Sequence, residues 1–318
     1  MSYTIAAPVL KTESTTDLAV SVIVPVRDRA EHLRALIAAL AAQTINGGRF
    51  EVIVGDDGST DCAVEELSTE DGWLRVSSAP PRNSYAARNR AVSLARAPVL
   101  AFCDSDCRPE PTWLEAGLAA LEKSDVVAGL IRFQLPERRT VWTLLDVDMF
   151  LDQERAVRAG RAATANLFVR RALFERMGGF DDALPNTGDY DFVSRCVSSG
   201  ARLAFEPEAV VWHQTRDDAR SLVRKVWAVN RRYAERESRA GRRPNALKVR
   251  EWVPLVQPLR SRRRFGRSLV LDRSRLTAND LRPSMREDLA ALPLLYVVFP
   301  YLSAVAQLRG ALDGRRAR

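Results

Sequence analysis

Residues Ala19–Val26 read AVSVIVPV, and residues Glu31–Gln43 downstream read EHLRALIAALAAQ. The first stretch is short, apolar and rich in β-branched valine and isoleucine, which favours a buried strand. In the second stretch, leucine and isoleucine recur every three or four residues, which is typical of an amphipathic helix. A buried strand followed at once by such a helix is the opening unit of an α/β fold.

The same alternation of strand and helix patterns continues for the first 130 or so residues. Further strands are predicted at Phe50–Val54, Trp73–Val76, Pro98–Cys103 and Val126–Phe133. Further helices are predicted at Cys62–Leu67, Tyr85–Ala95 and Pro111–Lys123. Strands separated by helices of this length pair mainly in parallel, so we predict a Rossmann-like, mostly parallel sheet with flanking helices.

Two acidic clusters follow predicted strands. Asp56 and Asp57 come after the second strand, and Asp104-Ser105-Asp106 comes after the fourth. Open α/β sheets bind ligands beyond the carboxyl ends of their strands, which is where these clusters fall. Alternate residues of an extended segment point to one side, so the two carboxylates of the second cluster suit Mg²⁺ or Mn²⁺ and a diphosphate. An ordinary acidic loop is the alternative for each cluster.

Two later segments carry further candidate site residues. Asp189 lies at the start of a predicted helix and could act as a general base, or could simply complement the helix dipole. Asp191 and Arg195 follow it at helical spacing. His213 ends the apolar run VVWH, where a neutral imidazole could bind a metal or could serve only the structure.

The four cysteines are Cys62, Cys103, Cys107 and Cys196, and none forms a C-x-x-C pair. Cys103 and Cys107 flank the second acidic cluster, so a zinc site is conceivable, although reduced and partly buried thiols are the favoured interpretation. Nothing in this pattern requires an oxidising compartment. Residues Met1–Leu18 are polar and show no secretory signal, so we expect a cytoplasmic protein.

Six segments between residues 19 and 215 resemble, in the same order, those of family 2 glycosyltransferases with the GT-A fold. They are SVIVPVRDRAEHL, VIVGDDGSTD, AARNRAVSLARAPVLAFCDSDCRPEPTWL, ANLFVRRALFERMGGFDD, GDYDFVSRCVSSG and VVWH. The resemblance implies inverting transfer of a sugar from a nucleoside-diphosphate sugar, with a uridine diphosphate donor favoured, to an acceptor hydroxyl. It also implies a Mn²⁺ or Mg²⁺ cofactor and a role in the synthesis of cell-surface glycan or glycolipid. The acceptor would be a glycan, a lipid-linked glycan or a small molecule.

The resemblance assigns roles to individual residues. The residues assigned to the nucleotide and donor sugar are Pro25, Arg27, Asp56, Asp57, Arg88, Asp104 and Ser105. The metal is assigned to Asp106 and His213, and the catalytic base is Asp189. Residues assigned to support of this helix or to the acceptor side are Asn166, Asp191 and Arg195. Two positions depart from the family pattern, because Val26-Arg27-Asp28 replaces the usual Tyr-Asn and Gly188 replaces a glutamate.

The last third of the chain differs in charge from the rest. Residues 1–215 carry a net charge of −7 and residues 216–318 a net charge of +15. We therefore predict an N-terminal extension at 1–18, a catalytic domain at 19–215 and a basic, mainly helical region at 216–318. The basic region includes the run Arg260–Arg267.

Two segments of this basic region are predicted to be helical. Asp217–Arg239 is predicted as an amphipathic helix. Leu289–Leu308 holds twenty uncharged residues interrupted by Pro293 and Pro300, which favours two short helices over one membrane span. Basic and apolar surface together favour peripheral attachment to an anionic membrane at the inner face of the cell membrane. Packing on the catalytic domain is the alternative.

Two other classes of function remain open from the sequence. A metal-dependent phosphohydrolase or nucleotidyltransferase can also carry a D-x-D after a strand, but here Cys107-Arg108-Pro109 follows in place of the usual threonine or serine pattern. A nucleic-acid binder would use the basic tail, but the sequence has no recognised reading motif or aromatic platform, so we expect no nucleic-acid partner.

Overall fold

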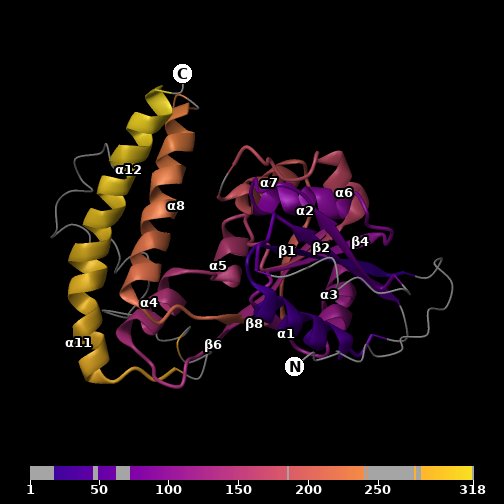
Figure 1. The fold of residues 1–318 in the computed structure, drawn as a ribbon, viewed down its shortest axis with the longest axis horizontal. Coiled ribbons are helices and arrows are strands. Elements are labelled where there is room, and N and C mark those ends of the chain that lie inside the picture. The colour runs from indigo at the N-terminus through magenta and orange to yellow at the C-terminus, as the bar shows by residue number, and fades with distance from the viewer. Residues whose placement is uncertain are drawn as a thin grey trace. The chain divides into compact units, whose positions relative to one another are not determined.

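The computed structural model describes residues 18–45, 49–61, 72–184, 186–239, 241, 276 and 281–316. The chain divides into two compact units, each drawn in Figure 1. The first comprises Met1–Arg132 and Asp152–His213, and the second comprises Phe133–Leu151 and Gln214–Arg318. The second unit thus takes in residues that precede the boundary predicted near residue 215. Cys62, the predicted helix Cys62–Leu67 and the basic run Arg260–Arg267 lie outside the described residues.

An eight-stranded sheet runs in the order β3-β2-β1-β4-β7-β6-β8-β5. Its strands are β1 Val20–Val26, β2 Phe50–Asp56, β3 Leu74–Ser78, β4 Val99–Cys103, β5 Cys107–Pro109, β6 Val126–Gln134, β7 Asn166–Arg170 and β8 Leu203–Gln214. The pairs β1–β2, β1–β4 and β2–β3 are parallel, as predicted. The pairs β4–β7, β6–β7 and β5–β8 are antiparallel, so the parallel run of β3, β2, β1 and β4 ends at β7.

The helices of the first unit are α1 Ala30–Ala41, α2 Ser84–Val92, α3 Trp113–Leu121, α5 Gln153–Arg158, α6 Arg171–Arg176 and α7 Gly188–Ser198. Local polar contacts fix where the first two begin. The Asn83 side chain accepts hydrogen bonds from the backbone N–H groups of Tyr85 and Ala86 and so caps α2. The first N–H of α1, at Ala30, donates to Asp61 at 3.0 Å. Both helices therefore start beside the carboxyl ends of the parallel strands.

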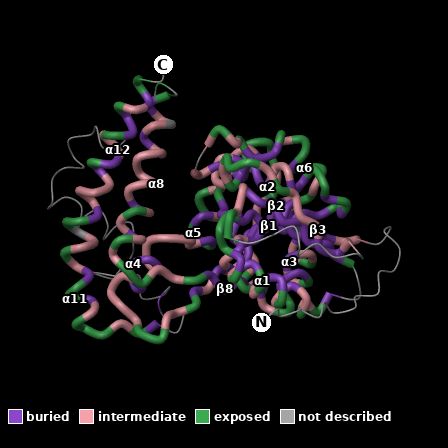
Figure 2. Tube along the Cα trace, viewed as in Figure 1, coloured by how far each residue is buried: buried purple, intermediate pink, exposed green. Residues whose placement is uncertain are grey.

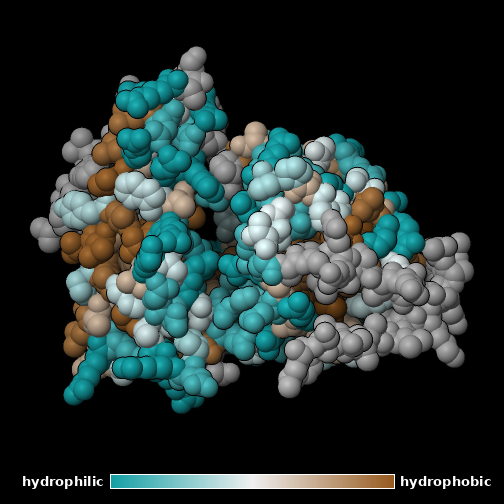
Figure 3. Space-filling view, in the orientation of Figure 1, coloured by the Kyte–Doolittle hydropathy of each residue, from teal (hydrophilic) through white to brown (hydrophobic). Residues whose placement is uncertain are grey.

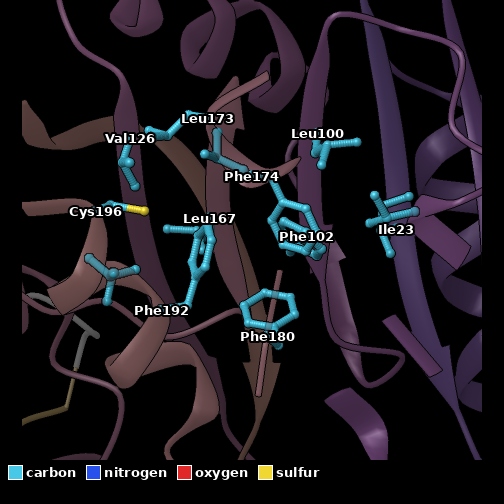
Figure 4. Close-up of a cluster of buried hydrophobic side chains, with 14 of the residues drawn as sticks. Ile23, Leu100, Phe102, Val126, Leu167, Leu173, Phe174, Phe180, Phe192 and Cys196 are labelled. Atoms are coloured by element: carbon cyan, nitrogen blue, oxygen red, sulfur yellow. The ribbon is translucent and has the colours of Figure 1, made fainter. Parts of the chain in front are cut away.

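The core of the first unit lies around the sheet, where Figure 2 shows the buried residues gathered. An aromatic cluster of Phe102, Phe174, Phe180 and Phe192 has ring centroids 5.0–5.6 Å apart (Figure 4). Such aromatic pairs add stability beyond the area that they bury. Because Phe192 belongs to α7 and Phe102 to β4, the cluster fixes α7 against the strand that leads to the D-x-D segment.

The second unit is built from helices α4 Val141–Met149, α8 Ala219–Arg239, α11 Met285–Pro293 and α12 Phe299–Arg316, with a π-helical turn at Leu294–Val298. The amphipathic helix predicted from residue 217 is confirmed as α8. Its Leu222 and Val226 are buried in one apolar cluster with Leu144 and Leu145 of α4.

The two short helices predicted in the twenty-residue uncharged segment continue into each other. The π turn follows Pro293, which lies inside α11. A proline cannot donate the regular helical hydrogen bond, so a local change of helix type after it is expected. In the part of the chain that the structure describes, no helix is both long enough and apolar enough to cross a membrane.

Helices α8 and α12 approach each other through glycines. A Cβ added at Gly310 would lie 1.8 Å from the carbonyl oxygen of Arg231, and one at Gly314 would lie 2.5 Å from that of Glu235. Polar contacts join the same two helices, including Ser238 Oγ to the carbonyl of Ala311 at 3.0 Å. The helix pair can therefore form only where α12 lacks side chains.

We expect Gly310→Ala to destabilise the second unit by about 1–3 kcal/mol, because the added methyl group forces two backbones apart. Chemical denaturation followed by circular dichroism measures the change. Leu312→Ala is the control, because Leu312 lies two residues away and is 53% exposed. Equal stability of the two variants would contradict the close packing of α8 on α12.

Candidate active site

The acidic turns predicted to form a site lie together at the ends of the parallel strands. Strand β1 pairs with β2 from Val20↔Phe50 to Val26↔Asp56, so both strands end at the same edge. The Asp57 N–H donates to the carbonyl of Val26 at 2.9 Å. Pro25 is buried within β1, whereas the Arg27 side chain beyond it is 53% exposed. The predicted nucleotide residues therefore share one edge of the sheet.

Hydrogen bonds hold both carboxylates of the first acidic turn. Asp56 Oδ1 accepts from the Ser59 N–H at 3.0 Å and from the Ser59 hydroxyl at 2.6 Å. Asp57 Oδ1 accepts from the Arg82 N–H at 2.7 Å. Asp56 and Asp57 are both buried, as is Ser105 of the D-x-D segment. These contacts fix the direction of two carboxylates at the carboxyl end of β2.

Helix α2 brings a buried arginine to the D-x-D segment. Arg88 is 4% exposed, and its Nη2 donates to Asp104 Oδ1 at 2.5 Å. Its guanidinium also lies 5.4 Å from the centre of the Tyr85 ring, a cation–π distance. Within the described residues, the buried Nε of Arg88 has no hydrogen-bond partner. Arg88 thus pairs with Asp104, while its Nε–H group remains without a partner in the described part of the chain.

A second cluster forms around Asp106. Ligand atoms of Asp106, Cys107 and His213 all lie within 4.8 Å of one another. His213 Nε2 is 3.5 Å from Asp106 Oδ1, and Arg29 Nη1 is 2.8 Å from Asp106 Oδ2. The cluster forms because β5 pairs with β8 in the register Cys107↔His213. A carboxylate and an imidazole that converge in this way fit a divalent metal ion.

Asp189 lies at the first turn of α7 and is held at both carboxylate oxygens. The Tyr85 hydroxyl donates to Oδ1 at 2.9 Å, and the Thr164 N–H donates to Oδ2 at 3.2 Å. Burial raises the pKa of Asp189 above its usual value, although these hydrogen bonds and the Arg88 charge favour its ionised form. Burial, followed by the negative charge of Asp189, raises the pKa of Tyr85 well above its usual value. Tyr85 and Arg88 thereby connect Asp189 to Asp104.

The sequence did not single out Tyr85 or Arg29. Tyr85 is three residues before Arg88, so the helical spacing of α2 already places both on one face. Arg29 immediately precedes α1 and has no pattern of its own. For Cys107 the sequence favours a reduced, partly buried thiol and leaves a zinc site as the alternative; in the structure the thiol is buried and forms no disulfide.

The predicted supporting residues hold the framework of the site. Asn166 is fully buried, and its side-chain amide donates to the carbonyls of Leu130 and Ala209 at 2.9 and 2.8 Å. Its Oδ1 accepts from the Trp113 indole at 2.9 Å, so its side chain ties β7 to its neighbours. Arg195 pairs with Asp191 at 2.9 Å along α7 and donates to the carbonyl of Gly179 at 2.7 Å.

Comparisons of the sequence with known proteins show which family it matches. Residues 21–178 match the family described as Glycosyl transferase family 2. Glycosyltransferase AglE of Haloferax volcanii is 32% identical over 204 residues, which cover 62% of this chain and 67% of the relative. The pre-mycofactocin glycosyltransferase of Mycobacterium tuberculosis is 29% identical over 218 residues, and the alignment spans 64% of this chain but only 44% of that longer relative.

A solved structure has a similar fold. It is the mannosyltransferase PcManGT of Pyrobaculum calidifontis in complex with GDP-Man and Mn²⁺. The two share 16% identity with a TM-score of 0.53, covering 96% of this chain and 90% of the mannosyltransferase. The structural match shows the GT-A type of fold. At this low sequence identity it does not identify the substrate. From its sequence match and its fold together, the chain belongs to family 2 of the glycosyltransferases.

Proposed function

We propose that this protein transfers a sugar from a nucleoside-diphosphate sugar to an acceptor hydroxyl, with inversion at the anomeric carbon. The observation that carries the proposal is the contact series Asp189–Tyr85–Arg88–Asp104. It joins a carboxylate with a raised pKa to the D-x-D segment, where a donor diphosphate would lie. A base on one side and an anion site on the other are what a single displacement requires.

The donor side would use the edge at which β1, β2 and β4 end. Asp56 and Asp57 offer fixed acceptors for the N–H groups of a base. Arg88 would bind a phosphate oxygen through its guanidinium, and Asp104 and Ser105 would contact the ribose or the donor sugar. The family resemblance favours uridine diphosphate, whereas the related mannosyltransferase structure holds GDP-Man.

Asp106 and His213 would hold the divalent metal ion. Their ligand atoms, Asp106 Oδ1 and His213 Nε2, already lie 3.5 Å apart. The metal would supply charge that stabilises the departing diphosphate. Arg29 pairs with the second oxygen of Asp106 at 2.8 Å and orients that carboxylate.

Asp189 would accept the proton of the attacking hydroxyl. A general base works best when its pKa approaches the working pH, and burial moves the pKa of Asp189 in that direction. Tyr85 and Thr164 orient the carboxylate through opposite oxygens. In this scheme the chain forms no covalent intermediate.

Thermal-shift measurements with a panel of sugar nucleotides, each with and without Mn²⁺, test the proposal. We expect one donor to raise the melting temperature only when the metal is present, because bound ligand stabilises the folded state. Release of the sugar to an acceptor then establishes transfer. Release of phosphate from simple phosphoesters without donor binding would favour the phosphohydrolase alternative.

We expect Tyr85→Phe to move the acid side of the pH–rate profile to higher pH. The Tyr85 hydroxyl favours the ionised form of Asp189, so its loss raises the pKa of that carboxyl further. The base is active only when deprotonated, and more alkaline solution is then needed for the same activity. Steady-state rates across pH measure the shift, with Tyr233→Phe on α8 as the control. An unshifted pH–rate profile would show that Tyr85 does not influence the pKa of the base.

The second unit offers a surface that fits an anionic membrane. Exposed apolar side chains on α11, the π turn and α12 are Met285, Leu289, Val297, Val298, Val305 and Leu312. Figure 3 shows apolar side chains gathered along these helices. Exposed arginines accompany them at positions 282, 286, 309, 315 and 316. Apolar side chains flanked by cations suit the interface of an anionic bilayer, so we infer peripheral attachment through this face.

Co-sedimentation with phosphatidylglycerol vesicles at low salt tests this attachment. We expect Leu289→Glu to reduce the bound fraction strongly, because it places a negative charge in the apolar face. Leu94→Glu is the matched control, since Leu94 is an exposed leucine of the first unit. Equal binding of the two variants, or no binding by the unmodified chain, would refute the membrane surface.

A further inference from the structure

The cluster around Asp106 contains a sulfur atom to which the proposed transfer gives no role. Cys107 Sγ lies within 4.8 Å of ligand atoms of Asp106 and His213. Cys107 and His213 are directly opposite each other on the antiparallel strands β5 and β8. Side chains of such a pair point to the same face of a sheet with their Cβ atoms about 5 Å apart. The sheet register itself therefore brings the thiol and the imidazole together.

We propose that Cys107 is a third protein ligand in this cluster and makes the site select Zn²⁺ and other thiophilic divalent cations over Mn²⁺. The inference rests on the metal site of the proposed function and specifies its ligand set. Asp106 supplies oxygen, His213 nitrogen and Cys107 sulfur. Three protein ligands leave a fourth position of a tetrahedral ion open for an oxygen of the diphosphate or of water.

The dimensions of the cluster suit a tetrahedral ion. Zn–S bonds of about 2.3 Å and Zn–N or Zn–O bonds of about 2.0 Å place neighbouring ligand atoms roughly 3.5 Å apart. Asp106 Oδ1 and His213 Nε2 already have this separation, at 3.5 Å. Because no two of the three ligand atoms are more than 4.8 Å apart, adjustments on the order of 1 Å complete the geometry.

The chemistry of the ligands decides which ion they prefer. Mn²⁺ and Mg²⁺ favour oxygen ligands, and a thiolate favours Zn²⁺, Co²⁺ and Cd²⁺. In the structure the Cys107 thiol lies 3.9 Å from the carbonyl of Ala165 and is 1% exposed. When the metal–sulfur bond forms, the thiol proton leaves to solvent, as it does in other cysteine metal sites.

Cys103 provides a matched control in the same turn. It is as deeply buried as Cys107 and lies at the end of β4, where its Sγ is 3.7 Å from the carbonyl of Asp104. It does not belong to the three-residue cluster. A serine at either position changes one atom and no charge of the neutral side chain. The Cys103 and Cys107 side chains hydrogen-bond each other, so both variants alter this contact and only Cys107→Ser removes the sulfur of the cluster.

Titration of the full chain with Co²⁺ in the absence of any sugar nucleotide tests the proposal. We expect a near-ultraviolet charge-transfer band from a cobalt–thiolate bond, which Cys103→Ser retains and both Cys107→Ser and Asp106→Asn lose. Zn²⁺ should displace the cobalt and abolish the band. In Cys107→Ser, the affinity for Zn²⁺ relative to Mn²⁺ should fall by more than about 100-fold, beyond what loss of an outer hydrogen bond causes.

Three results of the cobalt titration would contradict the proposal. A band that survives in Cys107→Ser, cobalt binding without a band, or no cobalt binding would each overturn the assignment of Cys107. Thermal melting of Cys107→Ser confirms that the variant is folded, and Asp106→Asn keeps the test valid if that variant is not. Because the band is read without donor or acceptor, it can fail while sugar transfer stands, and it can appear in a protein that transfers no sugar.

Discussion

Replacing Asp189 with asparagine is expected to lower kcat by about 10²–10⁴-fold while donor binding remains intact. The amide has nearly the shape of the carboxyl group and cannot accept the proton of the attacking hydroxyl. The contacts of Asp189 are to Tyr85, Thr164 and Tyr190, none of which belongs to the metal cluster. Donor affinity, measured by calorimetry with Mn²⁺, should therefore change little.

Asp191→Asn is the matched control for this experiment. Asp191 lies on the same helix, and its carboxylate pairs with Arg195 at 2.9 Å in place of any contact with Tyr85. We expect this variant to lose some thermal stability and to keep most of its turnover. Retained turnover in Asp189→Asn would show that Asp189 is not the catalytic base.

Asp106→Asn is expected to weaken Mn²⁺ binding by more than about 100-fold and to abolish metal-dependent donor binding. Asp106 is the one carboxylate of the cluster with His213 and Cys107, so its loss leaves no anionic oxygen among these three residues. Changes to groups that merely support a metal ligand cost about 10–100-fold in affinity, and loss of the ligand should cost more. Calorimetric titration with Mn²⁺, before and after addition of donor, measures both effects.

The control for this variant is Asp28→Asn, the same chemical change on a nearby surface loop. Asp28 has a positive φ of 50°, a conformation that asparagine tolerates, and its Oδ1 accepts from Thr60, as an amide oxygen also can. Unchanged Mn²⁺ affinity in Asp106→Asn would show that the ion is held elsewhere. Weakened affinity in both variants would point to a general electrostatic effect.

The sequence was sufficient for the part of the fold that is periodic and local. Strands β1, β2 and β4 are apolar runs between turns, and α1 and α8 carry regular apolar spacing. These signals are physical, since burial on one or both faces dictates the repeat. The prediction gave no strand at β5, which has three residues, or at β7, which has five, and of the twelve-residue β8 it found only the run VVWH. A strand of three residues, such as β5, is too short to show a periodic pattern.

Local sequence patterns could not predict the long-range contacts that define the site. The hydrogen bond from Tyr85 to Asp189 spans 104 positions, and the pairing of Cys107 with His213 depends on the register of β5 with β8. Both follow from the order of strands in the sheet, which sequence periodicity does not determine. The family resemblance identified Asp106, His213 and Asp189 singly, and the structure shows what connects them to their neighbours.

The absence of a side chain at Gly55 has a consequence for the chemistry proposed above. A Cβ at this position of β2 would lie 2.4 Å from the carbonyl oxygen of Ala87, so α2 rests directly on the strand backbone. Tyr85 and Arg88 flank that point of contact on α2. The contact between α2 and β2 therefore positions both the proposed base, through Tyr85, and the proposed diphosphate site, through Arg88. A methyl group at Gly55 would move α2 and displace the two together.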